Sequence, residues 1–166
     1  MRRSKIRYIL TASFLITALV ILLLVFVAKF PEFYCKRCLN SNISDFDNLV
    51  SYVRQYELTG KISVEDGDIP LEVEEILVRL NNKYQSDSDY PVFTGLSAKN
   101  DGNGNIYMSV QVRKDKIPSG DGYDSPDIRC YELVYVDPDY GDSIKEISAR
   151  PFNGNWRIWS SDMWSG

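Results

Sequence analysis

The most regular pattern in the chain is a hydrophobic run of 21 residues without a charge, from Tyr8 to Ala28. At a helical rise of about 1.5 Å per residue, this run extends about 31 Å, close to the hydrocarbon thickness of a bilayer. A helix pairs every backbone N–H and C=O within the segment, as the lipid environment requires. We therefore predict one transmembrane helix over residues 8–30.

Charges at the two ends of the run predict its orientation. Four Lys and Arg residues lie within residues 1–7, whereas three are spread over residues 29–37. The positive-inside rule favours a cytoplasmic N-terminus and a C-terminal domain outside, but the small difference leaves the reverse orientation open. A cleaved signal peptide is the other alternative, with an apolar core of usually about 7–15 residues and a small-x-small cleavage site. Because the run is longer and Phe26 occupies the first small position, we expect an uncleaved signal-anchor.

After a spacer at residues 31–43, apolar residues at three- and four-residue spacing predict two helices. The first begins with Ser44 as its N-cap and ends before Gly60. The second begins at Pro70, and the Glu residues of its first turns complement the helix dipole. The apolar stripes are Phe46, Leu49, Val50, Val53 and Tyr56 in the first helix and Val73, Ile76, Leu77, Leu80 and Tyr84 in the second.

From Tyr90 onward, apolar and polar residues alternate, which is the period of half-buried strands. A turn sequence at Asn100–Gly104 joins the first two strands into a hairpin. Two helices followed by four or five antiparallel strands give an α+β fold. This order is similar to that of cystatin-like and NTF2-like rolls, an analogy of element order alone. The predicted strands are 92–98, 106–113, 128–136, 144–149 and 156–159, with a Gly-, Pro- and Asp-rich loop at 114–127.

The composition of the chain beyond the anchor excludes several classes of function. From Leu39 to Gly166 there are 12 Lys and Arg against 22 Asp and Glu, a net charge of −10, and residues 44–166 suffice for one domain. Such a surface repels phosphate groups, so we expect no nucleic-acid partner. The chain contains no histidine, which excludes Ser-His-Asp and Cys-His nucleophiles and the usual zinc sites.

Three cysteines are present, Cys35 and Cys38 just after the anchor and Cys130 far downstream. Outside the cell they predict one disulfide, either local or with Cys130, and one spare thiol. The alternative is a membrane-tethered thiol/disulfide protein in which Lys36 and Arg37 stabilise the thiolates of a redox pair. A thioredoxin-type pair follows a strand at a helix N-terminus, whereas this pair follows a membrane helix. In the reverse orientation, the pair would be a candidate for palmitoylation.

Acidic residues in the loops do not match a metal site. Asp101–Asn105 resembles the opening of an EF-hand loop, but Ile106 replaces the required Gly and Val112 replaces the bidentate Glu. A hairpin turn is the better interpretation, because such turns require Asn, Asp and Gly. The Asp-rich loops on either side of strand 128–136 lie about 30 Å apart by strand length, too far to share an ion. Each loop alone could hold a weakly bound extracellular calcium ion, but solvated loops are the better interpretation. We expect no metal and no cofactor.

Aromatic residues near the C-terminus are the candidate binding residues. Trp156 shares a face with Ile158, which predicts burial, whereas Trp159 lies opposite and Trp164 is almost at the terminus. Flat rings give a large contact area at a small entropy cost, so an exposed group of Trp159, Trp164 and Tyr140 would suit a sugar or a peptide.

The sequence therefore predicts a non-enzymatic, single-pass membrane protein with a small acidic domain outside. Its expected partners are the lipid bilayer, through residues 8–30, and another envelope protein or a cell-wall component. One alternative is a hydrolase that uses two carboxylates, for which Glu132 and Asp137 are available. The other is the thiol protein based on Cys35 and Cys38. No catalytic residue is assigned.

Overall fold

The chain forms two compact units, Met1–Tyr34 and Cys35–Gly166, which we describe separately. In the computed structural model, side chains of the N-terminal helix are described at residues 13–24, at 26 and from 30 onward. The described backbone comprises residues 2–67, 69–88, 90–117, 127–140 and 152–163.

One long helix, α1 (Arg2–Ser41), contains all of residues 8–30, so this segment is helical as predicted. Every described side chain from Ser13 to Phe26 is exposed, on all sides of the helix. Within the described part of the chain, no helix has both the length and the apolar character needed to cross a membrane. The transmembrane assignment therefore stays a prediction. The large exposed apolar residues here are Phe14, Leu15, Ile16, Leu19, Val20, Ile21, Leu22, Leu23, Leu24 and Phe26.

The end of α1 belongs to the second unit. Residues 31–43, interpreted from the sequence as a spacer, are helical through Ser41, and Pro31 lies inside the helix. Cys35, Cys38 and Leu39 are fully buried in the second unit. Their spacing of three and four residues places them on one face of the helix, where they can pack together against the domain.

Two further α-helices confirm the predicted pair, namely α2 (Ile43–Gln55) and α3 (Leu71–Tyr84). The N-cap of α2 is Asn42 and not Ser44, and the Asn42 side chain makes no capping hydrogen bond. Short 3-10 turns follow at Val64–Asp66 and Gln85–Asp87. The residues buried by the two helices belong to the predicted stripes: Phe46, Leu49, Val50 and Val53 in α2, and Val73, Ile76, Leu77 and Leu80 in α3.

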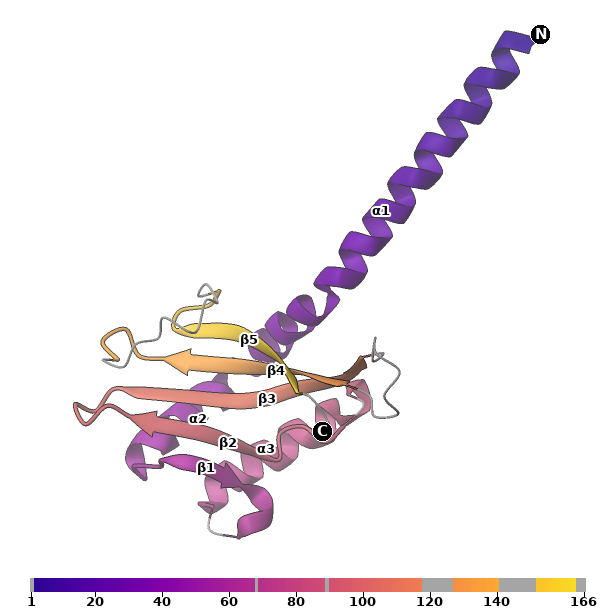
Figure 1. Ribbon diagram of the computed structural model, residues 1–166. Helices are drawn as coiled ribbons and strands as arrows, with labels where there is room; N and C mark the ends of the chain where they lie inside the picture. The colour runs from indigo at the N-terminus through magenta and orange to yellow at the C-terminus, as the bar shows by residue number, and fades with distance from the viewer. Residues whose placement is uncertain (1, 68, 89, 118–126, 141–151, 164–166) are drawn as a thin grey trace. The chain divides into compact units, whose positions relative to one another are not determined.

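The strands form one antiparallel sheet in the order β1-β2-β3-β4-β5, so the described elements confirm an α+β fold. Figure 1 shows α2 and α3 behind this sheet, on the same face. The strands are β1 (Gly60–Ser63), β2 (Gly95–Asn100), β3 (Ile106–Ile117), β4 (Asp127–Val136) and β5 (Trp156–Met163).

The strand predictions differ from the structure in several places, among them β5, which extends to Met163 beyond the predicted end at Trp159. β1 was not predicted, because it has only four residues and its burial does not alternate. β2 begins at Gly95 and not at residue 92, since Phe93 has a left-handed backbone with φ of 54°, which an extended strand cannot include. β3 continues to Ile117, into the predicted loop. The predicted strand at residues 144–149 lies outside the described residues.

The core lies between the sheet and the two helices. Leu96, Val110 and Leu133 are paired across three neighbouring strands and are all buried. The ring of Phe46 from α2 lies 5.4 Å from that of Trp156 in β5, edge to face. Trp156 is therefore in the core, as its shared face with Ile158 predicts.

Candidate binding surface

The face of the sheet directed away from α2 and α3 carries a group of polar and aromatic side chains. Because neighbours along a strand alternate between faces, the burial of Trp156 against α2 places Arg157 and Trp159 on this outer face. Trp159 pairs with Glu132 in β4, and Glu132 pairs with Gln111 in β3. Directly paired residues share a face. We call Gln111, Glu132, Arg157 and Trp159 the Trp159 cluster.

The carboxylate of Glu132 lies in the middle of this cluster. It accepts a hydrogen bond from Nε2 of Gln111 at 3.5 Å. Burial, and secondly the negative charge of Glu132, raise the pKa of the nearby Tyr107 hydroxyl. The Glu132 side chain is thus partly exposed on the sheet, and among the described residues it accepts one long hydrogen bond from a neighbouring amide.

On β5, Trp159 lies directly opposite Glu132, and Arg157 lies two residues further along the same face. Trp159 is 36% exposed, whereas Trp156 is only 3% exposed. Arg157 pairs with the buried Val134, and its Nε is buried without a hydrogen-bond acceptor among the described residues. An unsatisfied buried donor costs about 1–3 kcal/mol, so this Nε lowers the stability of the sheet locally.

The three predicted aromatic binding residues do not form one exposed group in the described structure. Tyr140 is 8% exposed, packs with Val134 and Val136, and lies 6.3 Å from the ring of Tyr107. Trp164 lies outside the described residues. Of the two that the structure describes, Trp159 alone presents an exposed ring.

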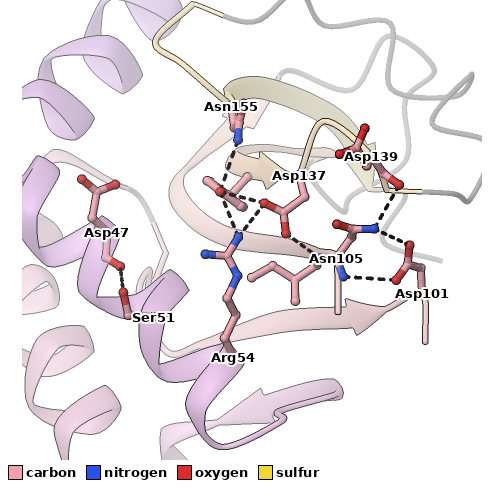
Figure 2. A network of polar contacts seen from close by, with 10 residues as sticks. Asp47, Ser51, Arg54, Asp101, Asn105, Asp137, Asp139 and Asn155 are labelled. Atoms are coloured by element: carbon pink, nitrogen blue, oxygen red, sulfur yellow. Dashed lines mark hydrogen bonds and ion pairs between the residues drawn. The ribbon is translucent and has the colours of Figure 1, made fainter. Parts of the chain in front are cut away.

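A second polar group lies where β4 ends and holds α2 to the sheet. Nη2 of Arg54 donates to Oδ1 of Asp137 at 2.5 Å and to the Tyr135 hydroxyl at 3.3 Å. That hydroxyl donates to Asp137 at 2.9 Å and accepts from Nδ2 of Asn155 at 3.2 Å. The backbone N–H of Ile106 donates to Oδ2 of Asp137 at 2.8 Å. Figure 2 shows these groups converging on Asp137.

These contacts determine the protonation of Asp137. Burial alone would raise the pKa of its carboxyl, but the hydrogen bonds from Arg54, Ile106 and Tyr135 together hold this pKa below its usual value. Asp137 is 7% exposed and both of its oxygens accept hydrogen bonds. It is therefore a buried anion with a structural role.

The two carboxylates of the hydrolase alternative do not form a pair. Glu132 and Asp137 are five residues apart on an extended segment, which separates them by about 16 Å. The paired carboxylates of glycosidases lie about 5–9.5 Å apart. The geometry thus gives no support to acid–base hydrolysis by these two residues.

The hairpin turn between β2 and β3 confirms the turn interpretation of Asp101–Asn105. Oδ1 of Asp101 accepts from the backbone N–H of Asn103 at 2.8 Å, and Oδ2 accepts from Nδ2 of Asn105 at 2.9 Å. The same amide donates to the Asp139 carbonyl, as Figure 2 shows. The Asp101 oxygens therefore stabilise the turn. In the described part of the chain, no group of three or more acidic or Cys residues could hold a metal ion.

Cys35 and Cys38 lie in the interior, one helical turn apart on α1. Burial, and then the neighbouring Cys38, raise the pKa of Cys35 to about 12. Burial also raises the pKa of Cys38 to about 12, against opposing effects of Lys83 and Tyr84. Side chains at this helical spacing have Cβ atoms about 5–6 Å apart, beyond the 3.5–4.5 Å of a disulfide. Both are buried protonated thiols, an environment that does not favour redox catalysis; Cys130 is buried as well.

Asn42, between α1 and α2, connects these helices to α3. Its Nδ2 donates to the Cys38 carbonyl and to the Tyr84 hydroxyl, each at 2.6 Å. Its Oδ1 accepts from Nζ of Lys83 at 2.7 Å. The buried amide of Asn42 thus links three helices, and its role is to stabilise their packing.

Comparisons of the chain with models of protein families, with curated proteins and with solved structures find no significant match. The arrangement of the side chains and the charges of the chain are therefore the basis for its function. Gln111 and Arg157 are not among the binding residues predicted from the sequence, in which Glu132 is only a candidate catalytic carboxylate. The alternation along β5 could have placed Arg157 beside Trp159, but no sequence signal relates either residue to Gln111.

Proposed function

We propose that this chain is a single-pass membrane protein that presents a small acidic binding domain outside the membrane, with its N-terminus in the cytoplasm. The observation that carries the proposal is the exposure of the apolar residues of α1 between Phe14 and Phe26. A helix that is apolar all round belongs in a protein core or in a lipid bilayer.

Transfer of these exposed apolar side chains from water into lipid would be strongly favourable. Complete burial of one Val, Leu, Ile or Phe side chain contributes about 1.5–3 kcal/mol. Ten such residues are exposed over Phe14–Phe26, so transfer of this segment into lipid would contribute on the order of 20 kcal/mol. The clustered basic residues before it favour the cytoplasmic N-terminus.

A binding role suits the domain better than catalysis. Asp137 is a buried anion held by Arg54, and the thiols of Cys35 and Cys38 are buried and protonated. The polar residues around the exposed ring of Trp159 are of the types that commonly recognise ligands. The domain would therefore contact a component of the cell envelope.

Membrane insertion is tested with the full chain and a double variant, Leu19→Arg with Leu23→Arg. Wild-type protein should stay in the membrane pellet after alkaline carbonate and dissolve in detergent. Because each Arg at the centre of a span costs about 2.5–3.5 kcal/mol, alkaline carbonate should extract a larger fraction of the double variant than of the wild-type chain. Val78→Arg, at an exposed apolar residue of α3, should leave the wild-type behaviour unchanged. Carbonate extraction of the wild-type chain would refute the anchor.

Orientation and the absence of catalysis need separate measurements. Protease added to right-side-out vesicles should remove a C-terminal epitope and spare an N-terminal one, and the opposite pattern would reverse the proposed topology.

Purified protein should show no turnover of chromogenic ester, peptide or glycoside substrates. Turnover that Glu132→Gln abolishes would contradict the binding role.

A further inference from the structure

We infer that the Trp159 cluster binds a neutral saccharide on the outer face of the sheet. This inference rests on the proposed function, since it names the class of ligand that the domain would contact. Its members come from three strands, β3, β4 and β5, and meet only through strand pairing. The cluster therefore belongs to the folded sheet and not to any one segment.

The dimensions of the cluster match one or two sugar rings. The Cβ atoms of directly opposed residues, such as Glu132 and Trp159, lie about 4.5–5.5 Å apart. Gln111 is one further strand away, at about 4.8 Å, and Arg157 is two residues from Trp159, at about 7 Å. The four side chains thus cover a patch about 10 Å across, on a face without intervening backbone.

The chemistry of the four groups is complementary to a sugar. The exposed indole of Trp159 offers a flat apolar surface for the C–H face of a pyranose ring. The Glu132 carboxylate accepts from neighbouring hydroxyls, and the Gln111 amide both donates and accepts. Arg157, which is partly exposed, adds a guanidinium that can donate to sugar oxygens.

Charge and position favour a neutral saccharide over other ligands. The net charge of −10 beyond Leu39 and the central Glu132 carboxylate oppose an anionic ligand. An extended peptide usually adds to the edge of a sheet through backbone hydrogen bonds, whereas this cluster consists of side chains on a sheet face. A neutral sugar ring can stack on the indole of Trp159 and donate hydroxyl hydrogen bonds to Glu132. It therefore uses both the aromatic and the polar side chains of the Trp159 cluster.

Isothermal titration calorimetry of the full chain in detergent micelles tests the inference. The probes are chitotetraose, cellotetraose and maltotetraose, titrated into the millimolar range. At least one should bind, and Trp159→Ala should weaken its binding by at least about tenfold, with a similar loss for Glu132→Gln. Trp159→Phe, which retains a flat ring, should weaken binding less than Trp159→Ala.

The matched control is Tyr56→Ala, which removes an aromatic ring of similar exposure at the residue that follows α2. It should leave saccharide binding unchanged. Failure of all three probes, or wild-type affinity in the correctly folded Trp159→Ala variant, would overturn the inference. Heat from an uncharged peptide but from no saccharide would replace it with a peptide site. Carbonate extraction of the membranes before solubilisation is independent of these results, so a failed saccharide site does not refute the anchor.

Discussion

Arg54, in the last turn of α2, donates a 2.5 Å hydrogen bond to Asp137, the residue directly after β4. The two residues are 83 positions apart in the chain, and their contact joins the helical layer to the sheet. Arg54 is partly exposed, whereas the Asp137 side chain is nearly buried, so the carboxylate depends more on the contact than the guanidinium does.

Asp137→Ala should lower the free energy of unfolding by about 3 kcal/mol, because it removes hydrogen bonds to a charged group and leaves the Ile106 N–H without its partner. Chemical denaturation monitored by circular dichroism would measure this change. Asp139→Ala is the control: Asp139 is exposed and contributes only its backbone carbonyl, so the loss should stay within about 0.5 kcal/mol. Equal losses in both variants would contradict the assigned role.

The stability that Asp137 contributes should depend on pH. Its pKa is lowered by folding, so the contribution is fully present above the unfolded aspartate value of about 3.9 and is lost as the pH falls through the lower, folded value. The difference in unfolding free energy between wild type and Asp137→Asn should be constant near neutral pH and shrink below about pH 4. Denaturation curves at a series of pH values would measure it; a difference that grows on acidification would be inconsistent with the lowered pKa.

Gly95→Ala should strongly destabilise the domain. A Cβ at this position would lie 2.1 Å from the carbonyl oxygen of Ile62 in β1, and backbone atoms cannot move aside cheaply. We expect a loss of about 2–3 kcal/mol and disruption of the β1–β2 pairing, measurable by denaturation and by amide hydrogen exchange in β1. Ser97→Ala, on the same strand, should cost less than about 1 kcal/mol. A Gly95→Ala variant as stable as wild type would show that β1 does not approach β2 this closely.

Cys35 and Cys38 should react slowly with thiol reagents in the folded protein. Both are buried and have a pKa of about 12, so the reactive thiolate is scarce at neutral pH. Reaction with a chromogenic disulfide reagent should proceed only as the protein unfolds, and denaturant should accelerate labelling of both thiols. Rapid labelling of either residue in the native chain would restore the thiol-based alternative.

The sequence by itself determined the elements whose patterns are local. Stripes at three- and four-residue spacing identified α2 and α3, since each helix must bury one face, and the Asn- and Gly-rich turn identified the β2–β3 hairpin. The uncharged run identified a long apolar helix, and α1 contains it. Each of these signals depends on residues only a few positions apart.

Tertiary structure alone decided what depends on pairing between distant segments. β1 forms because residues 60–63 meet β2, and Tyr140 is buried because it packs on Tyr107. Trp159 lies beside Glu132 through strand register, which no local period encodes. Burial of Cys35 and Cys38 likewise requires the domain that covers them. A short-range pattern specifies which face of an element is apolar, but long-range packing specifies which residues then meet.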